Sequence, residues 1–253
     1  MDDTAIVAVQ RKCQRRYYAS LVGAPETRLH RGDDGVQALI TPGAPGVSFL
    51  NGVVYEDGPA LVAALDELDA MYVEAGVKAW TVWVHHDDDD TGPACEARGH
   101  KLDGTPALMV GEIAELDLAP RRDVEIRTEP DWFTLGDLNG VAYGGPRGAM
   151  GPLMVGVDPT DYKTAIAYRD GVALACTAGQ ITDGNCEILF VATDPDARRQ
   201  GLAGECMVSV LRQALEAGAT TTTLESSALG EPVYVRMGYR TIGRMTMWER
   251  RRR

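Results

Sequence analysis

Residues 191–204 read Val191-Ala192-Thr193-Asp194-Pro195-Asp196-Ala197-Arg198-Arg199-Gln200-Gly201-Leu202-Ala203-Gly204. An apolar segment typical of a buried strand ends here, a turn with Pro195 follows, and a helical pattern begins at Leu202. Small residues at 201, 203 and 204 let an anion approach the backbone, where the free N–H groups of the first helical turn and the helix dipole hold it. Arg198 and Arg199 add positive charge. The stretch therefore predicts a strand–loop–helix unit that binds a diphosphate group.

Three further roles for these glycines fit the stretch less well. A helix start can use glycine only for turning, but the combination of a strand, arginines and small residues favours the phosphate site. A P-loop is excluded because the chain has no Gly-Lys-Ser/Thr sequence here. A Rossmann fingerprint fits poorly, because the glycine spacing differs and the preceding strands are joined by hairpins.

The surrounding residues predict a mixed sheet flanked by helices. Arg169-Asp170-Gly171 and Thr182-Asp183-Gly184 are typical hairpin turns, so the strands before the diphosphate loop are expected to be antiparallel. The strand after the helix follows a right-handed crossover and is expected to be parallel. The expected strands are 124–127, 164–168, 172–180, 186–192, 220–224 and 239–248. The expected helices are 131–142, 202–216 and 232–237, with a Gly/Pro-rich loop at 144–156.

Two motifs of this half resemble a known family. Arg198-x-x-Gly201-x-Ala203 is similar to the acyl-CoA pyrophosphate motif, Arg/Gln-x-x-Gly-x-Gly/Ala, of the GNAT superfamily of N-acyltransferases. Residues 225–239 resemble the family's ending, in which a tyrosine, here Tyr234, stands four residues before a Gly-Phe/Tyr pair, here Gly238-Tyr239. The motifs occur in the right order, separated by one helix and one strand. The resemblance covers residues 124–248, about half of the chain.

This resemblance implies roles for individual residues. Tyr234 is placed like the general acid that protonates the departing CoA thiolate, which a tyrosine pKa of about 10 suits; the alternative is an aromatic side chain packed on a short helix. Glu187 is the expected general base, acting through a water, and a surface carboxylate at a strand start is the competing interpretation. The even separation of Glu187 and Val191 predicts that both side chains lie on one face. The residues expected to bind acyl-CoA are Val191 and Thr193 through their backbone, Arg198, Arg199, Gln200, Gly201, Leu202, Ala203 and Gly204 at the diphosphate, and Ser227 at the pantetheine arm or the tyrosine.

The first half carries a fainter copy of the same pattern, although αβαβ segments also look alike by coincidence. A strand at 48–55, an amphipathic helix at 58–74 and strands at 79–84 and 105–110 follow the order of the second half. The helix entry, residues 55–59, has two carboxylates and no arginine, and Cys95 takes the place of the tyrosine. We therefore expect an α/β (α+β) fold of two GNAT-like mixed-sheet domains in tandem. The first, 1–118, is truncated and degenerate, does not bind CoA, and serves as a scaffold or as one wall of the acceptor cleft; the second, 123–249, is catalytic; residues 250–253 form a basic tail.

Composition and charge limit the class of protein. The chain has 253 residues, of which 45% are hydrophobic and 25% charged, and a net charge of −12, which argues against nucleic-acid partners. No apolar stretch reaches the roughly 20 residues that cross a bilayer and no secretory signal is recognised, so a cytoplasmic protein without membrane partners is expected. No metal is expected, because the run Asp87–Asp90 after His85-His86 fits a solvated turn better than a metal cluster. The cysteines contain no CxxC pair: they are Cys13, Cys95, Cys176, Cys186 and Cys206.

The expected function is acetyl transfer from acetyl-CoA, as co-substrate, to a primary amine by direct attack in a ternary complex. A covalent acyl-enzyme is not expected, because Cys206 has no histidine partner in its half. The alternatives are a non-catalytic acyl-CoA-binding sensor or interaction module, and a transferase that uses a longer acyl-CoA. The acid-rich composition favours a cationic small-molecule amine or a peptide as acceptor, and a homodimer is one option for assembly.

Overall fold

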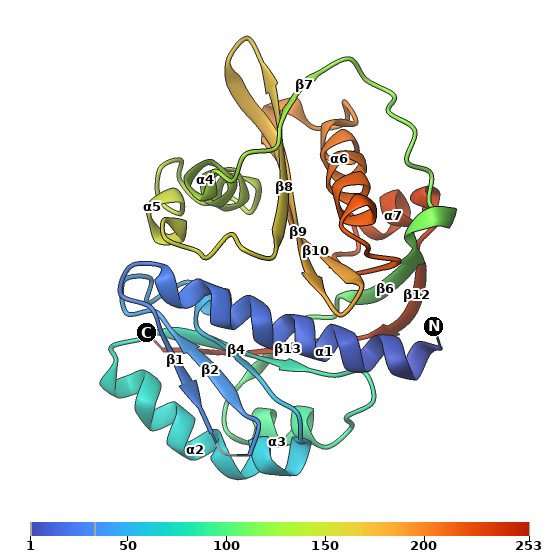
Figure 1. Ribbon diagram of the computed structural model, residues 1–253. Coiled ribbons are helices and arrows are strands. Elements are labelled where there is room, and N and C mark those ends of the chain that lie inside the picture. Colours follow the sequence, from blue (N-terminus) through green and yellow to red (C-terminus); the bar gives the residue numbers. More distant parts are fainter. Residues whose placement is uncertain (1, 33, 253) are drawn as a thin grey trace.

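The computed structural model describes residues 2–32 and 34–252, and within them the strands form a six-stranded and a seven-stranded sheet (Figure 1). The first sheet has the order β1-β2-β3-β4-β13-β5 and the second the order β12-β6-β11-β10-β9-β8-β7. Both are mixed, because β3 and β4 run parallel in the first and β10 and β11 in the second, while the other neighbours are antiparallel. The predicted mixed α/β fold with two mixed sheets is confirmed.

The strands have the following bounds. The first sheet contains β1 (Arg28–Arg31), β2 (Gln37–Ile40), β3 (Gly52–Val54), β4 (Ala79–Val84), β5 (Lys101–Gly104) and β13 (Thr246–Arg251). The second contains β6 (Ala107–Glu112), β7 (Glu125–Arg127), β8 (Tyr162–Arg169), β9 (Val172–Thr182), β10 (Asn185–Thr193), β11 (Thr221–Ser226) and β12 (Arg240–Arg244).

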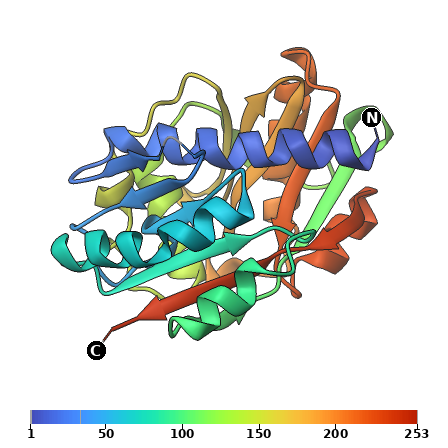
Figure 2. The same ribbon diagram turned by 90° about the horizontal axis from the view of Figure 1, so that it is seen from below.

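The two sheets exchange strands. β6 precedes the predicted boundary at 118–123, yet it pairs with β11 and β12 in the second sheet. β13 is the last strand along the described chain, yet it lies between β4 and β5 in the first sheet, and Figure 2 shows it in red beside β4. Each sheet therefore needs a strand from the other segment, which the predicted division into 1–118 and 123–249 does not provide for. Arg250 and Arg251, expected in a basic tail, are the last residues of β13, and residue 253 lies outside the described residues.

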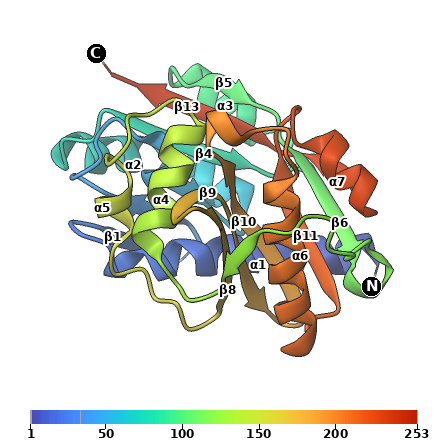
Figure 3. The ribbon, with the colours of Figure 1, turned by 90° about the horizontal axis from the view of Figure 1, so that it is seen from above.

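Helices cover the outer faces of both sheets. α2 (Gly58–Glu74) and α3 (Thr91–Ala97) pack on the first sheet around Trp80, while α6 (Leu202–Glu216) and α7 (Glu231–Met237) pack on the second. α4 (Trp132–Ala142) lies on the opposite face of strands β8–β10 from α6, as Figure 3 shows. The predicted Gly/Pro-rich loop contains the short helix α5 (Gly151–Met154), which packs against α4. A third core joins Leu39 and Val54 of the first sheet to Cys176 of the second, so the sheets share one buried interface.

The first helix, α1 (Asp3–Ser20), was not predicted from the sequence. Asp2 caps it, since its side chain accepts a hydrogen bond from the amide of Ala5 at 2.8 Å. Its buried face includes the amides Gln10 and Gln14 among apolar residues, and these interrupt the apolar stripe that marks an amphipathic helix. The helix crosses the interface between the two sheets and contacts β9 and β10 (Figure 1).

Candidate active site

The parallel strands β10 and β11 separate along their length. Their register pairs only residues 185–187 with residues 221–223, and beyond Glu187 the two strands are no longer partners. On its other side β10 carries a bulge, because Leu189 pairs with Ala178 whereas Ala192 pairs with Cys176. Phe190 adopts a φ of 53°, which is uncommon for an aromatic residue and bends the strand. Among the described residues, the β11-facing backbone of residues 188–193 therefore has no strand neighbour.

The bulge also reverses the alternation of side chains along β10. Val191 packs in the core between the second sheet and α6, whereas Ala192 packs in the core that joins the two sheets. Glu187 points to the latter side, where its carboxyl meets Cys13 of α1. The prediction that Glu187 and Val191 share a face was therefore wrong, because the extra residue of the bulge shifts the period of two.

The loop after β10 prepares the N-terminus of α6 without capping it. After the turn Pro195–Ala197, Arg199 and Gly201 both take left-handed backbone angles, with φ of 63° and 81°. Gly201 is the N-cap and provides no side-chain hydrogen bond, so the first amides of α6 have no acceptor within the helix. A Cβ built on Gly204 meets nothing within 4 Å, and Leu202 anchors the helix start in the core. An anion therefore has open access to these N–H groups.

Arginines from distant parts of the chain converge on this loop. The Nε of Arg122 donates to the carbonyl oxygen of Gln200 at 3.2 Å, and Nη1 of Arg169 donates to Oε1 of Gln200 at 2.9 Å. Arg198 turns away to the carbonyl of Ala142 at the end of α4, at 2.7 Å. The sequence analysis assigned Arg169 only to a hairpin turn and did not single out Arg122. Together with the open helix start, this positive charge suits a diphosphate, so the residues present fit an acyl-CoA.

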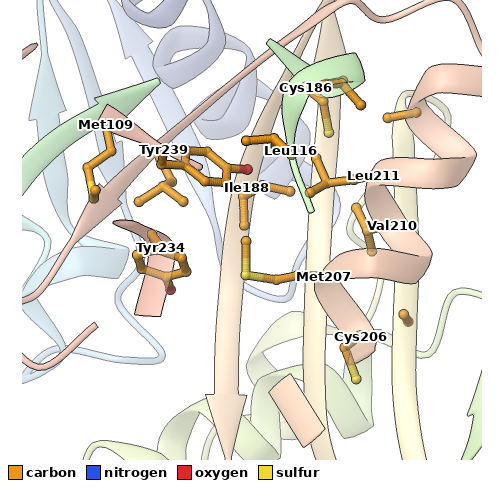
Figure 4. Close-up of a cluster of buried hydrophobic side chains, with 14 of the residues drawn as sticks. Met109, Leu116, Cys186, Ile188, Cys206, Met207, Val210, Leu211, Tyr234 and Tyr239 are labelled. Carbon is orange, nitrogen blue, oxygen red and sulfur yellow. The ribbon is translucent and has the colours of Figure 1, made fainter. Parts of the chain in front are cut away.

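Tyr234 lies on α7, beside the opening between β10 and β11. Its ring is 6.0 Å from that of Tyr239 and packs in the same core as Ile188 and Met207 (Figure 4). Burial raises the pKa of Tyr234 above its usual value, which keeps the hydroxyl protonated. Among the described residues its hydroxyl has no hydrogen-bond partner, so its proton is available to a ligand.

Ser227 shapes the turn that leads into α7. Its Oγ accepts a hydrogen bond from the amide of Gly230 at 3.3 Å, and its carbonyl accepts from Glu231 at 3.0 Å. A side chain on Gly230 would meet the Tyr234 ring, because a Cβ built there lies 3.0 Å from Cε2. The turn thus sets the position of Tyr234. Ser227 itself is exposed, on the segment that follows the diverging end of β11.

Glu187 is buried rather than exposed at a strand start. Only 1% of its surface is accessible, and Oε2 has no hydrogen-bond partner among the described residues. Beside it lies the carboxyl of Glu225 on β11, which sequence reasoning did not single out. The alternative that Glu187 is a surface carboxylate is wrong, because α1 covers it. Burial, followed by the nearby Glu225, raises the pKa of Glu187 well above its usual value.

The described residues contain no cluster of three or more histidine, cysteine or acidic side chains arranged to hold a metal ion. His85 lies next to Tyr55, and Asp88 accepts hydrogen bonds from Tyr55 and Thr91 at 2.6 and 2.7 Å. The acidic run therefore includes a turn that caps α3. None of the helices in the described part of the chain has the length and apolar character to cross a bilayer.

Residues 157–248 match the family model of the acetyltransferase (GNAT) domain. No curated protein matches the chain at a significant level. Among solved structures, a GCN5-related N-acetyltransferase from Kribbella flavida is similar, with 19% identity, a TM-score of 0.69, and coverage of 94% of this chain and 93% of that one. A tandem GNAT protein from the clavulanic acid biosynthesis pathway has 13% identity and a TM-score of 0.63, covering 96% of this chain and 94% of that one. The fold is thus that of tandem GNAT proteins; the chain carries an acetyltransferase (GNAT) domain in its C-terminal region and is an acyltransferase.

Proposed function

We propose that the chain is an N-acetyltransferase that moves an acetyl group from acetyl-CoA to a primary amine by direct attack in a ternary complex. The observation that carries this proposal is the uncapped N-terminus of α6 directly after the strand β10, which diverges from β11. The bound co-substrate supplies an acetyl thioester, which a free amine attacks as the CoA thiolate leaves. The residues of this chain bind the two substrates and move the protons.

Binding of the co-substrate is assigned to the loop and the diverging strand. The amides of residues 200–204 hold the diphosphate, and Arg199 balances its charge together with Arg122 and Arg169, while the side chain of Arg198 bonds the carbonyl of Ala142 instead. The backbone of Val191 and Thr193 faces the opening and bonds the pantetheine arm in the manner of an added strand. Ser227 lies on the other side of this opening and contacts the arm near Tyr234.

Tyr234 acts as the general acid. It gives its hydroxyl proton to the departing sulfur and recovers a proton from the nitrogen that has attacked, so its own charge is restored at the end of the cycle. A covalent acyl-enzyme on Cys206 is disfavoured, because burial raises the pKa of this thiol to about 12 and no accessible thiolate forms near neutral pH.

The general base is assigned to the carboxyl pair to which Glu187 belongs. An amine acceptor arrives mainly as an ammonium ion, which has no lone pair for attack and must first lose a proton. A buried carboxyl whose pKa is raised by its surroundings is a stronger base than an exposed one and accepts such a proton more readily. The pair lies on the face of the second sheet that α1 covers. The first segment of the chain, residues 1–118, therefore contributes to the acceptor side of the site.

The first segment does not bind CoA in this proposal. The N-terminus of α2 is capped by Asp57, which accepts from the amide of Ala60 at 3.0 Å. Oδ2 of Asp88 lies 2.6 Å from the position that a Cβ on Gly58 would take. Two carboxylates at this helix start repel a diphosphate.

Two measurements test the proposal. Calorimetric titration of acetyl-CoA is expected to give one site per chain, and thiol release in the presence of cationic primary amines is expected to report turnover. Tyr234→Phe keeps the ring but removes the proton, so kcat should fall by about 100-fold or more while the affinity for acetyl-CoA stays the same. Two sites per chain would refute the assignment of the first segment. An unchanged kcat in Tyr234→Phe would refute the assignment of the acid.

A further inference from the structure

Two carboxyl groups meet beneath α1, one from each of the diverging strands. Glu187 of β10 is opposite Thr223 of β11, and Glu225 is two residues further along β11, so its side chain points to the same face. The two carboxyls share a hydrogen bond. Glu187 is fully buried, whereas Glu225 is partly accessible at the point where the strands separate. The two acids therefore differ in access to the opening.

The hydrogen bonds around the pair are unequal. Nε2 of Gln10 and Nε2 of Gln14 both donate to Oε1 of Glu225, the second at 3.3 Å. The two glutamines are four residues apart on α1, which places them on one side of the helix, over Glu225. Apart from its bond to Glu225, the only donor to Glu187 among the described residues is the weak thiol of Cys13. The donors of α1 are thus directed to one member of the pair.

This asymmetry decides where a shared proton resides. Two neighbouring carboxyls in a dry site do not both ionise, and the pair titrates as a unit. Burial raises the pKa of each, but hydrogen bonds from Gln10, Glu187 and Gln14 lower that of Glu225, while the charge of Glu225 raises that of Glu187 further. The other titratable groups that face the pair stay neutral because burial raises their pKa values: they are Cys13, Tyr17, Tyr18 and Tyr162.

We propose that Glu225 is the general base, that Glu187 is its protonated partner, and that Gln10 and Gln14 are positioning residues that keep Glu225 ionised. This inference rests on the proposed acetyl transfer. One N–H bond of the acceptor ammonium breaks, its proton goes to a Glu225 oxygen, and the electron pair left on nitrogen forms the new bond to the acetyl carbon. Glu225 then releases the proton to solvent through the opening.

Unpaired oxygens beside the pair suit the ammonium. Oε1 of Gln10, Oε1 of Gln14 and Oε2 of Glu187 are buried and have no hydrogen-bond partner among the described residues. A primary ammonium brings three N–H donors, and a buried acceptor without a partner is costly. In this proposal the amino group of the acceptor is recognised by side chains of α1. The substrate class is therefore a primary amine rather than an alcohol or a thiol.

The matched variants Glu187→Gln and Glu225→Gln test the division of roles. A glutamine at 187 still donates an N–H to Glu225, as the protonated acid does, so kcat should fall by less than about tenfold. A glutamine at 225 removes the base, and kcat should fall by about 100-fold or more. Glu249→Gln on β13 controls for the substitution itself. In Gln10→Leu and Gln14→Leu the rising limb of the pH–kcat profile should move to higher pH, a shift that a purely structural role would not produce. A larger loss in Glu187→Gln than in Glu225→Gln would overturn the proposal.

Infrared spectroscopy tests the same assignment without turnover. The carbonyl stretching band of a buried protonated carboxyl should be present in the unmodified chain and in Glu225→Gln, and absent in Glu187→Gln. A band that disappears only in Glu225→Gln, or no such band in the unmodified chain, would overturn the inference even if the enzyme is active. Failure of the proposed function would show separately, as absence of acetyl-CoA binding and of thiol release in the unmodified chain.

Discussion

Gly204 is the third residue of α6, in the turn whose amides are assigned to the diphosphate, and the space around it is open. Replacing it by glutamate brings a carboxylate to the place where the diphosphate is expected, without a steric clash. Unlike Gly201, Gly204 does not have a left-handed backbone, so a side chain is accepted there without strain. The substitution therefore perturbs the proposed ligand site and spares the fold.

The two effects of Gly204→Glu have opposite signs. A carboxylate about 4 Å from each of two diphosphate charges costs roughly 1 kcal/mol per charge even at the dielectric constant of water, which corresponds to a loss of affinity of about 30-fold. The folded protein, in contrast, gains about 0.3–1 kcal/mol from a negative charge at a helix N-terminus and up to about 1 kcal/mol from the loss of a helical glycine. We expect weaker acetyl-CoA binding together with equal or higher thermal stability.

Calorimetric titration of acetyl-CoA and thermal unfolding of the same samples measure the two effects. Gly204→Gln has nearly the same size without the charge, and Gly204→Ala adds only a methyl group, so the series separates bulk from electrostatics. The affinity should fall in the order Ala, Gln, Glu. Wild-type affinity in Gly204→Glu would refute the placement of the diphosphate at this helix. A variant that is both weaker in binding and less stable would refute the claim that the site is open.

Two further predictions follow from burial and strand pairing. Burial lowers the pKa of His85 and His100 to about 4, so the unfolded chain binds more protons than the folded one between pH 6.5 and 4, and each histidine should reduce the free energy of unfolding by about 3 kcal/mol across that window. Urea unfolding at pH 7.5 and 4.5 measures this, and His100→Phe should lose less stability on acidification; equal losses would count against it. Shortening the chain to end at Met245 removes β13 from between β4 and β5 and should abolish cooperative unfolding, whereas removal of residues 252–253 alone should not; a shortened chain that unfolds cooperatively would show that the first sheet does not need β13.

Local chemistry explains why the diphosphate loop was recognisable from the sequence. Gly201 and the small residues next to it form a motif of neighbouring residues that can be recognised in the sequence. The hairpin turns and the helix 202–216 are likewise predicted by residue patterns within short segments. The presence of two mixed sheets was predicted from the same kind of local pattern. Tyr234 was identified by its spacing from Gly238, although its role remains a prediction.

Features that depend on distant contacts could not be read in this way. α1 was not predicted because the polar residues Gln10 and Gln14 occupy its buried face. There they donate hydrogen bonds to Glu225, which is more than two hundred residues away in the chain. The bulge at Phe190 could not be predicted, because an aromatic residue is not typical of a left-handed backbone. The bulge shifts the alternation of side chains, so the prediction that Val191 shares a face with Glu187 was wrong. The exchange of β6 and β13 was invisible because local pattern does not say which partner a strand takes.

The exchanged strands also set an order for folding during synthesis. β4 and β5 emerge from the ribosome early, but the strand that belongs between them is the last one described, roughly 140 residues after β6. At about 5–20 residues per second, the interval from β6 to β13 is roughly 7–28 s. During that time the nascent chain exposes unpaired edges of β4, β5 and β6, which invite pairing with other chains. The first sheet therefore cannot be completed before β13 has been synthesised, whereas every strand of the second sheet precedes β13 in the chain.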